Sequence, residues 1–214
     1  MKEFVPYFKE HFYQKLLTPN GSNPVRNRAD GFLKIFEILD RQKNDPLYKK
    51  DTFHILETGC MRPDHGDLCY GDDGVSSFIF DTFVNEMGGA VVSVDIDPIN
   101  VEYTKSKVSD KTRLYCDDSV SFISKIPAAQ KFDLLYLDSF DIHKDNPHPS
   151  QLHHLMELAA VMKNTKPGTI IAVDDQDAFF DGGIVGKGTY VKIFMERIGA
   201  KLIHNGYQII WELT

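Results

Sequence analysis

Five short apolar runs, separated by helix-like segments, restrict the fold of this chain more than any other feature. The runs span residues 52–57, 90–95, 112–117, 132–138 and 169–175, and each ends in an aspartate or a glutamate. Between the first two runs, the segment Ser76–Met87 has the spacing of an amphipathic helix, with Ile79 and Phe83 on one stripe. Strands that alternate with helices in this way are typical of a parallel sheet covered by helices.

Residues 200–213 break the alternation. Two further apolar runs occur there, 200–204 and 207–213. Asn205 and Gly206 lie between them, and this pair tolerates the positive φ angles of a two-residue type I′ hairpin. We therefore expect an α/β fold: a Rossmann-like seven-stranded sheet, mostly parallel with a C-terminal antiparallel hairpin, and helices on both faces.

Residues 1–50 precede these strands and are expected to form an N-terminal helical cap or lid, distinct from a domain over residues 51–214. Phe32 and Phe36 lie there at helical spacing. Arg28 either folds over a ligand as part of the lid or, as we expect, stays an exposed charge at the start of a helix. The amphipathic N-terminal segment is also a candidate element for a homodimer.

A second amphipathic helix is expected over residues 149–163. Its apolar stripe is expected to face the sheet, which leaves His153 and Glu157 on the solvated side. Although these two residues have the letters of a metal motif, a solvated face is the better interpretation. The apolar stripe comprises Leu152, Leu155, Met156, Ala159 and Met162.

Composition restricts the class of protein. With 214 residues, 42% of them apolar, the chain is long enough for one sizeable core. The formal net charge of −7 disfavours a nucleic-acid partner, and the longest unbroken basic run is Lys49 and Lys50. Because the sequence lacks an apolar stretch long enough to span a bilayer, we expect no membrane partner. Three cysteines at irregular spacings indicate reduced thiols and hence a cytoplasmic protein.

The acidic ends of the runs predict a ligand site, because ligands of open parallel sheets bind beyond the C-terminal ends of the strands. Asp95 ends the second run, and a carboxylate there can accept hydrogen bonds from both hydroxyls of a ribose. Asp97, followed by Pro98, has the pattern of a helix cap. After the third run, Asp118 and Ser119 either meet an adenine edge or cap the next helix.

A glycine-rich, acidic segment accompanies the first run, over residues 55–77. Gly59, Gly71 and Gly74 would let the backbone pass close to a ligand. The helix that begins near Ser76 offers free N–H groups to a carboxylate. Taken alone, such a loop is explained equally well as a tight strand-to-helix turn.

The ordered set of these motifs resembles the class I S-adenosylmethionine-dependent methyltransferases over roughly residues 50–214. The set comprises ETGC, GDDGVSS, VDIDP, CDDS, LYLDS and the final hairpin. One departure is that Gly59-Cys60 and a long insertion replace the usual GxGxG. The resemblance implies S-adenosylmethionine as the cofactor, bound by residues of these motifs: Glu57, Gly59, Gly74, Ser76, Asp95, Asp118, Ser119 and Asp138.

Two more carboxylate positions indicate a subgroup. Asp138 ends the fourth run, and Asp174 and Asp175 end the fifth. Three carboxylates brought together repel one another unless a cation or a lysine shares the site, and Lys187 is a candidate for that lysine. The pattern is similar to that of catechol O-methyltransferase-like enzymes, with Asp175 in place of their asparagine. This resemblance implies Mg²⁺, or another divalent cation, bound by Asp138, Asp174 and Asp175.

Together these features predict an S-adenosylmethionine-dependent methyltransferase that methylates a hydroxyl group of a small molecule. A divalent cation would assist by lowering the pKa of that hydroxyl. His143 and Lys144 are the candidate catalytic bases, and Asp141 also qualifies by residue type. Two alternatives stay open. One is a metal-independent methyltransferase whose aspartates bind a polar substrate directly, and the other is a non-catalytic α/β module that binds a nucleotide or cofactor.

Overall fold

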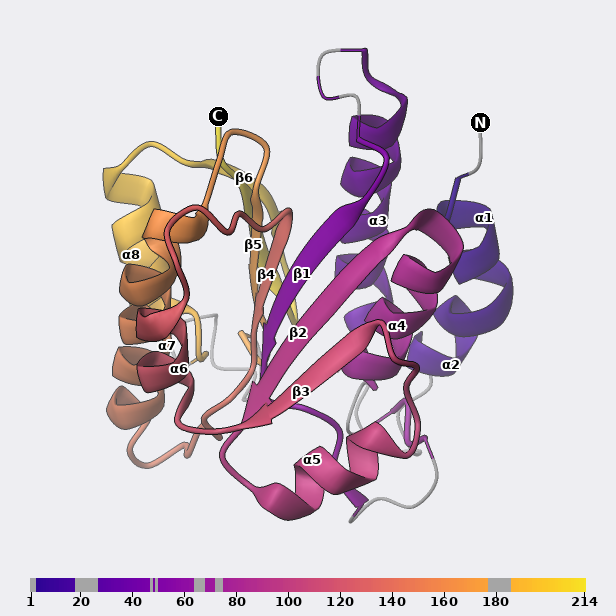
Figure 1. The fold of residues 1–214 in the computed structure, drawn as a ribbon. Coiled ribbons are helices and arrows are strands. Elements are labelled where there is room, and N and C mark those ends of the chain that lie inside the picture. The colour runs from indigo at the N-terminus through magenta and orange to yellow at the C-terminus, as the bar shows by residue number, and fades with distance from the viewer. Residues whose placement is uncertain are drawn as a thin grey trace.

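One mixed sheet forms the centre of the computed structural model, which describes residues 3–17, 27–46, 48, 50–63, 68–71, 75–176 and 186–214. Within these residues the strand order is β3-β2-β1-β4-β5-β7-β6, and β7 runs antiparallel to both of its neighbours (Figure 1). The predicted Rossmann-like sheet with its C-terminal hairpin is thereby confirmed. The strands are β1 (Phe53–Thr58), β2 (Gly89–Asp95), β3 (Thr112–Cys116), β4 (Leu134–Leu137), β5 (Ile170–Val173), β6 (Lys201–Asn205) and β7 (Ile209–Glu212).

Helices cover both faces of the sheet (Figure 1). α3, α4 and the N-terminal helices lie on one face, whereas α6, α7 and α8 lie on the other. β4 and β5 are buried at every position, because a strand covered on both sides needs a continuous apolar run. No helix in the described part of the chain is long and apolar enough to cross a membrane. The helices are α1 (Val5–Phe8), η1 (Lys9–Tyr13), α2 (Gln14–Leu17), α3 (Arg28–Asn44), α4 (Ser76–Met87), α5 (Pro98–Lys105), α6 (Ser119–Lys125), α7 (His148–Val161), η3 (Met162–Asn164) and α8 (Thr189–Arg197).

The N-terminal helices share a hydrophobic core with one face of the sheet. The rings of Phe8 and Phe36 lie 5.0 Å apart in this core. The carboxylate of Asp40 in α3 accepts hydrogen bonds from the backbone N–H of Phe4, which holds the start of α1 against α3. The described part of residues 1–50 therefore packs on the sheet, and its function as a lid stays a prediction.

α7 faces the sheet with a different side from the one predicted. Leu152 and Met156 are 50% and 47% exposed. Polar residues lie on the buried side because they bond to distant segments: Gln151 donates to a backbone carbonyl, and Glu157 accepts from the hydroxyl of Ser139. The predicted apolar face and the predicted solvated position of Glu157 are therefore wrong. The buried residues of α7 are Ser150, Gln151, His154, Glu157, Leu158 and Val161.

The turn of the β6–β7 hairpin is longer than predicted. Asn205 pairs with Ile209, which leaves three residues in the turn, and neither Asn205 nor Gly206 has a positive φ angle. Tyr207 and Gln208 donate hydrogen bonds from this turn to side chains just after β5 and in β4. The predicted two-residue type I′ turn is therefore wrong, because the paired positions are separated by three residues and the required positive φ angles are absent from Asn205 and Gly206.

Gly59, the residue directly after β1, has a φ of 77° and packs against the chain that follows β4. A Cβ at this position would lie 2.5 Å from the backbone oxygen of Asp138. We predict that Gly59→Ala lowers the free energy of unfolding by about 3 kcal/mol or more, because the strained φ alone costs roughly 1–2 kcal/mol and the backbone must also shift.

Gly199→Ala separates the two effects. Gly199 has a similar φ of 71°, but nothing lies within 4 Å of an added Cβ, so we expect a loss of only about 1–2 kcal/mol. Urea unfolding followed by circular dichroism measures both variants. Equal losses would contradict a close contact between Gly59 and the backbone of Asp138.

Candidate functional site

A cavity of about 340 Å³ opens at the C-terminal ends of the parallel strands. These strand ends lie toward the bottom of Figure 1. Residues that follow β1, β2 and β4 line the cavity. This is the edge at which the sequence predicts a ligand, because it is where parallel strands end side by side. The lining includes Gly59, Arg62, Ser76, Asp95, Asp97, Asp138 and Asp141.

Backbone hydrogen bonds join the ends of β1 and β2 and position Asp95. The N–H of Gly59 donates to the carbonyl of Val94 over 2.8 Å. The N–H of Cys60 donates to the Asp95 carboxylate over 2.9 Å, and the N–H of Asp97 donates to its other oxygen over 2.8 Å. The Asp95 carboxylate is therefore held at the wall of the cavity by two backbone groups.

Two of the predicted aspartates cap helices. Asp97 accepts from the N–H of Ile99 at the start of α5, and the bond is 2.8 Å long. Asp118 accepts from the N–H of Ser121 at the start of α6, also over 2.8 Å. The predicted cap at Asp97 is confirmed, and Asp118 has the cap role that the sequence left open.

A second cavity, of about 150 Å³, adjoins the first beyond the end of β2. Asp95, Ile96 and Ser139 line both cavities, so the two share one wall. Phe140 adds an aromatic ring to the second. Its lining residues are Val94, Asp95, Ile96, Asp118, Ser119, Ser139, Phe140 and His153.

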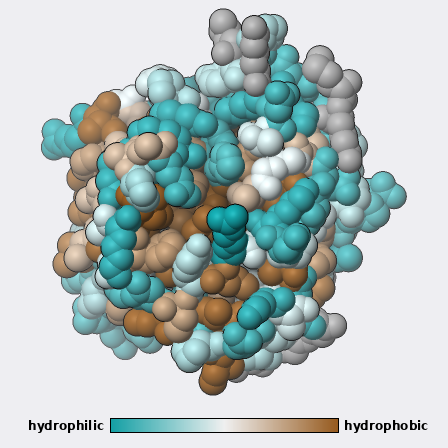
Figure 2. Space-filling model, in the orientation of Figure 1, coloured by the Kyte–Doolittle hydropathy of each residue, from teal (hydrophilic) through white to brown (hydrophobic). Residues whose placement is uncertain are grey.

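Exposed hydrophobic side chains lie beside these cavities. Ile96 and Ile99 are 73% and 64% exposed. Figure 2 shows hydrophobic surface at the lower end of the molecule, where α5 lies in Figure 1. Since Ile96 lines both cavities, an apolar group of a ligand bound in either cavity would cover side-chain surface that is now in water.

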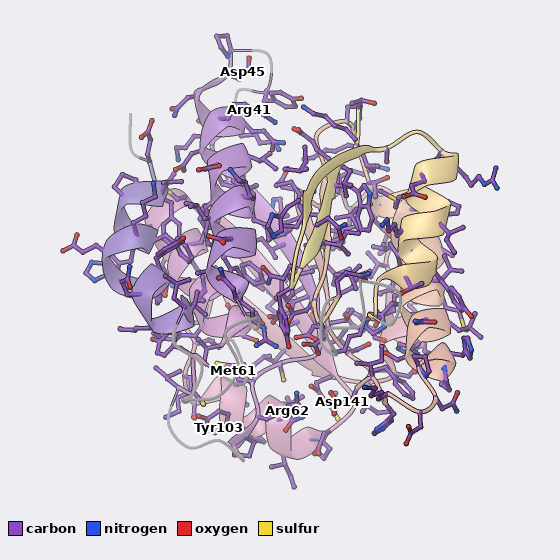
Figure 3. The ribbon with its side chains drawn as sticks, turned by 180° about the vertical axis from the view of Figure 1, so that it is seen from behind. Arg41, Asp45, Met61, Arg62, Tyr103 and Asp141 are labelled. Atoms are coloured by element: carbon purple, nitrogen blue, oxygen red, sulfur yellow. The ribbon has the colours of Figure 1, made fainter. Side chains whose placement is uncertain are left out.

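An ion pair joins the loops after β1 and β4 at the first cavity. Nη1 of Arg62 lies 3.0 Å from Oδ2 of Asp141, and Figure 3 shows the two side chains close to one another at the same end of the molecule as Met61. Both side chains are more than a third exposed, so their pairing contributes under about 1 kcal/mol to stability. Among the described residues, Arg62 is the one cationic side chain that lines this cavity.

Three carboxylates meet next to the first cavity, as the sequence predicts. One oxygen from each of Asp138, Asp174 and Asp175 lies within 4.8 Å of the others. Asp138 follows β4, and the other two follow β5, its parallel neighbour in the sheet. Adjacent strands thus bring three acidic side chains to one point.

Two buried cations neutralise these carboxylates. Nζ of Lys187 lies 2.5 Å from Oδ1 of Asp138 and 3.0 Å from Oδ2 of Asp175. The guanidinium of Arg28 lies 2.7 Å from Asp174 and 3.3 Å from Asp175. A lysine therefore shares the site, as the sequence suggests for Lys187. The expected exposed position of Arg28 is wrong, because its side chain is buried.

The phase of α3 explains why Arg28 points inward. Phe32 and Phe36 follow it at spacings of four and eight residues, so all three lie on the buried side of the helix. Asn27 caps the first turn, and the guanidinium of Arg28 packs 4.7 Å from the centre of the Tyr207 ring. Helical spacing is the sequence signal from which this buried cation could have been predicted.

Electrostatic interactions decide which groups of the cluster are charged. Burial alone would lower the pKa of Lys187, but Asp138 and Asp175 outweigh burial and raise it. Burial would raise the pKa of Asp175, but Lys187 and Arg28 hold it well below its ordinary value. Burial raises the pKa of Asp138 well above its usual range, and Asp174 adds to this rise while Lys187 opposes it. The two carboxyls that share the Lys187 ammonium therefore have pKa values shifted in opposite directions.

Glu57 positions a helix and does not line the cavity. Its carboxylate is buried and accepts hydrogen bonds of 2.6 Å from three hydroxyls, those of Ser76, Ser77 and Ser93. These bonds hold the N-terminus of α4 at the end of β1, so that Ser76 itself lines the first cavity. Gly74, also predicted to bind the cofactor, lies outside the described residues.

The two predicted catalytic bases, His143 and Lys144, lie on the loop between β4 and α7 and are exposed. His143 forms an isolated bridge with Asn146. Neither of the predicted bases lines the two cavities, whereas Asp141 of the same loop lines the first. Their role as bases stays a prediction.

Ionisable residues of α7 lie behind the second cavity. Glu157 is buried, accepts a hydrogen bond of 2.7 Å from Ser139 and lies 3.4 Å from Nε2 of His153. His154 is also buried, and its Nδ1 is 2.7 Å from the carbonyl of Ser150, to which it donates. Hydrogen bonding to Glu157 raises the pKa of His153, whereas burial lowers the pKa of His154 to about 4.

Comparison with known proteins identifies the fold. No model of a known protein family matches the sequence, and no curated protein matches it. The MycE methyltransferase of the mycinamycin biosynthetic pathway, solved with Mg and SAH, aligns with a TM-score of 0.59 and 17% identity over 99% of this chain. CalS11, a TDP-rhamnose 3′-O-methyltransferase of calicheamicin biosynthesis, aligns with a TM-score of 0.54 and 15% identity over 94% of this chain and 91% of its own.

These likenesses concern the fold. The present chain spans about half of the MycE chain, 55% of its length. At identities this low, the shared feature is the arrangement of the sheet and its helices. The chain thus has the Rossmann-like fold found in S-adenosylmethionine-dependent methyltransferases.

His154 makes the stability of the fold depend on pH. In the unfolded chain this histidine takes up a proton near its ordinary pKa of 6.5, whereas in the folded protein it does so only near 4. The unfolded state binds more protons between these values, so stability falls as the pH is lowered through them. We predict that His154 causes a loss of about 2 kcal/mol between neutral pH and about pH 5. In His154→Asn, whose amide can replace the bond to Ser150, this loss is absent.

His153→Gln provides the opposite comparison. Because the pKa of His153 is raised in the folded protein, its contribution is complete below the ordinary value of 6.5 and is lost as the pH rises through the folded value. This variant is therefore expected to be less stable than wild type at acidic pH. Urea unfolding at a series of pH values measures both effects. The same pH profile in wild type and His154→Asn would show that His154 is not held neutral.

Proposed function

We propose that the protein is an S-adenosylmethionine-dependent methyltransferase that acts on a hydroxyl group of a small molecule. The observation that carries the proposal is the pair of adjoining cavities at the C-terminal edge of the sheet, with Asp95 in the wall of both. With volumes of about 340 and 150 Å³, they reach the size of typical cofactor pockets, roughly 300–1,000 Å³. MycE and CalS11, which have the same fold, are methyltransferases.

The parts of the cofactor match the two cavities chemically. Asp95 is held by two backbone N–H groups, and a carboxylate has further acceptor capacity for two ribose hydroxyls. An adenine ring would pack between Ile96 and Phe140 in the smaller cavity. Asp118 and Ser119 lie at the edge of that cavity, where they would meet the polar rim of the base.

The charge of the larger cavity suits a sulfonium. Four aspartates line it; Arg62 pairs with Asp141 and Lys187 pairs with Asp138, so the excess negative charge is that of the other two. An excess of negative charge in a recessed site attracts a cationic ligand and stabilises it there. The four aspartates are Asp95, Asp97, Asp138 and Asp141.

Transfer of the methyl group from sulfur to oxygen requires that the hydroxyl proton leaves. Asp138 lines the larger cavity, and its raised pKa suits a carboxylate that accepts this proton. His143 and Lys144, the bases suggested by sequence, lie further along the same loop. The proposal therefore adds Asp138 to these two candidates.

Assistance by a divalent cation is the part of the sequence prediction that this geometry supports least. The three carboxylates have the ligand type and spacing for Mg²⁺. The ammonium of Lys187, however, already lies between Asp138 and Asp175. The position of Lys187 therefore favours the metal-independent form of the reaction.

Binding of S-adenosylhomocysteine tests the cofactor site. We predict that the wild-type protein binds it and that Asp95→Asn weakens binding by roughly 10- to 100-fold, because a hydrogen bond to a charged group contributes about 1.5–3 kcal/mol. Asp117→Asn is the control, since Asp117 also follows a strand but is paired with Lys125 on the surface. Isothermal titration calorimetry measures all three proteins. Absence of binding to the folded wild type, or equal weakening by both variants, contradicts the proposal.

Turnover assays distinguish the versions of the proposal. The protein is incubated with S-adenosylmethionine and a panel of small hydroxylated compounds, and mass spectrometry detects the added methyl group. Activity that is unchanged by EDTA supports the metal-independent reaction, and activity that requires Mg²⁺ supports cation assistance. Cofactor binding without product from any compound supports the non-catalytic module.

A further inference from the structure

Lys187 lies where three carboxylates would otherwise receive a metal ion. Its side chain is completely buried, and Nζ is 2.5 Å from Asp138 and 3.0 Å from Asp175. These are two of the three residues whose oxygens lie within 4.8 Å of one another. The third, Asp174, binds Arg28 through one oxygen. The ammonium therefore contacts two of the three carboxylates that would hold an ion.

The charges of the cluster disfavour a second cation beside Lys187. Lys187 and Arg28 already bring two positive charges to this cluster of three carboxyl groups. A divalent ion would add two more beside a buried ammonium group, where like charges repel strongly. Metal binding therefore requires that Lys187 leaves the site.

The backbone around Lys187 opposes that movement. Its N–H donates to the carbonyl of Asp175 over 3.2 Å. Gly186 and Gly188 flank it, and a Cβ on Gly186 would lie 1.9 Å from the backbone oxygen of Gln176. The segment is thus packed directly on the chain that follows β5, and a displaced Lys187 would leave a buried charge without its partners, which is strongly unfavourable.

We infer that Lys187 is the resident cation of this site. The folded protein binds no divalent metal at Asp138, Asp174 and Asp175, and removal of the Lys187 ammonium opens these carboxylates to one. Which ion occupies the site does not depend on whether the protein transfers a methyl group. This site differs from the divalent site that the sequence pattern implies, in which the same carboxylates coordinate Mg²⁺.

An unpartnered oxygen supplies a further ligand position in the opened site. Oδ1 of Asp174 is buried and has no hydrogen-bond partner in the part of the chain that the structure describes. In Lys187→Met, a side chain of similar length without charge, the carboxylates of Asp138 and Asp175 also lose their ammonium partner. Mn²⁺ and Mg²⁺ prefer such carboxylate oxygens, completed by water.

Titration with MnCl2 tests the inference, with electron paramagnetic resonance to count the bound ions. We predict no binding to wild type up to about 1 mM, the weak end of natural sites for such cations, and one ion on Lys187→Met with at least roughly 100-fold higher affinity. Lys201→Met, which removes an exposed lysine on β6, is expected to behave as wild type. In Lys187→Met with Asp174→Asn, the gained ion is expected to be lost.

Thermal unfolding provides a second readout. Because a ligand that binds only the native state raises its melting temperature, MnCl2 should stabilise Lys187→Met relative to EDTA and leave wild type unchanged. If Lys187→Met is unfolded in EDTA, MnCl2 should restore its circular dichroism. One ion bound to the wild type overturns the inference, as does a Lys187→Met protein that neither binds nor responds to MnCl2. Binding of S-adenosylhomocysteine to wild type is measured separately, so the proposed function can fail independently.

Discussion

The ion cluster around Asp175 is the interaction on which the rest of the structure depends. Arg28 reaches it from the first turn of α3, Lys187 from the segment before α8, and Tyr207 from the hairpin turn, where it donates to Asp175. An unpaired charge in such a buried position costs several kcal/mol, so each member requires the others. The cluster thereby ties the N-terminal helices, the hairpin and the segment before α8 to the ends of β4 and β5.

This constraint also positions the candidate cofactor site. Asp138 belongs to the cluster through Lys187 and lines the larger cavity at the same time. Asp95, on the opposite side of β1, is held independently by backbone N–H groups. Different interactions thus fix the two acids of the candidate site: an ion pair fixes Asp138, which would face the reacting part of a cofactor, and backbone hydrogen bonds fix Asp95, which would face its ribose. Gly59 follows β1, between these two acids. Because it has no Cβ, the chain after β1 can pack directly on the backbone that follows β4.

Local patterns predicted the sheet, α4 and the three acids, whereas contacts between distant segments decided the rest. A strand buried on both faces must be apolar throughout, and parallel neighbours end together, so the carboxylates at one edge followed from the runs alone. Hydrophobic spacing did not predict the buried face of α7. Glu157 lies on that face because it accepts a hydrogen bond from Ser139, and the spacing of apolar residues contains no information about such a contact. Arg28 lies 146 residues from Asp174, and only the folded chain shows that they pair.

The most direct measurement is a crystal structure of the wild-type protein grown with S-adenosylhomocysteine and MnCl2, with anomalous data collected for manganese. The account predicts the ligand across both cavities with its ribose at Asp95, the Lys187 ammonium between Asp138 and Asp175, and no anomalous peak there. A ligand bound elsewhere, or a manganese peak between those carboxylates with Lys187 displaced, would contradict it.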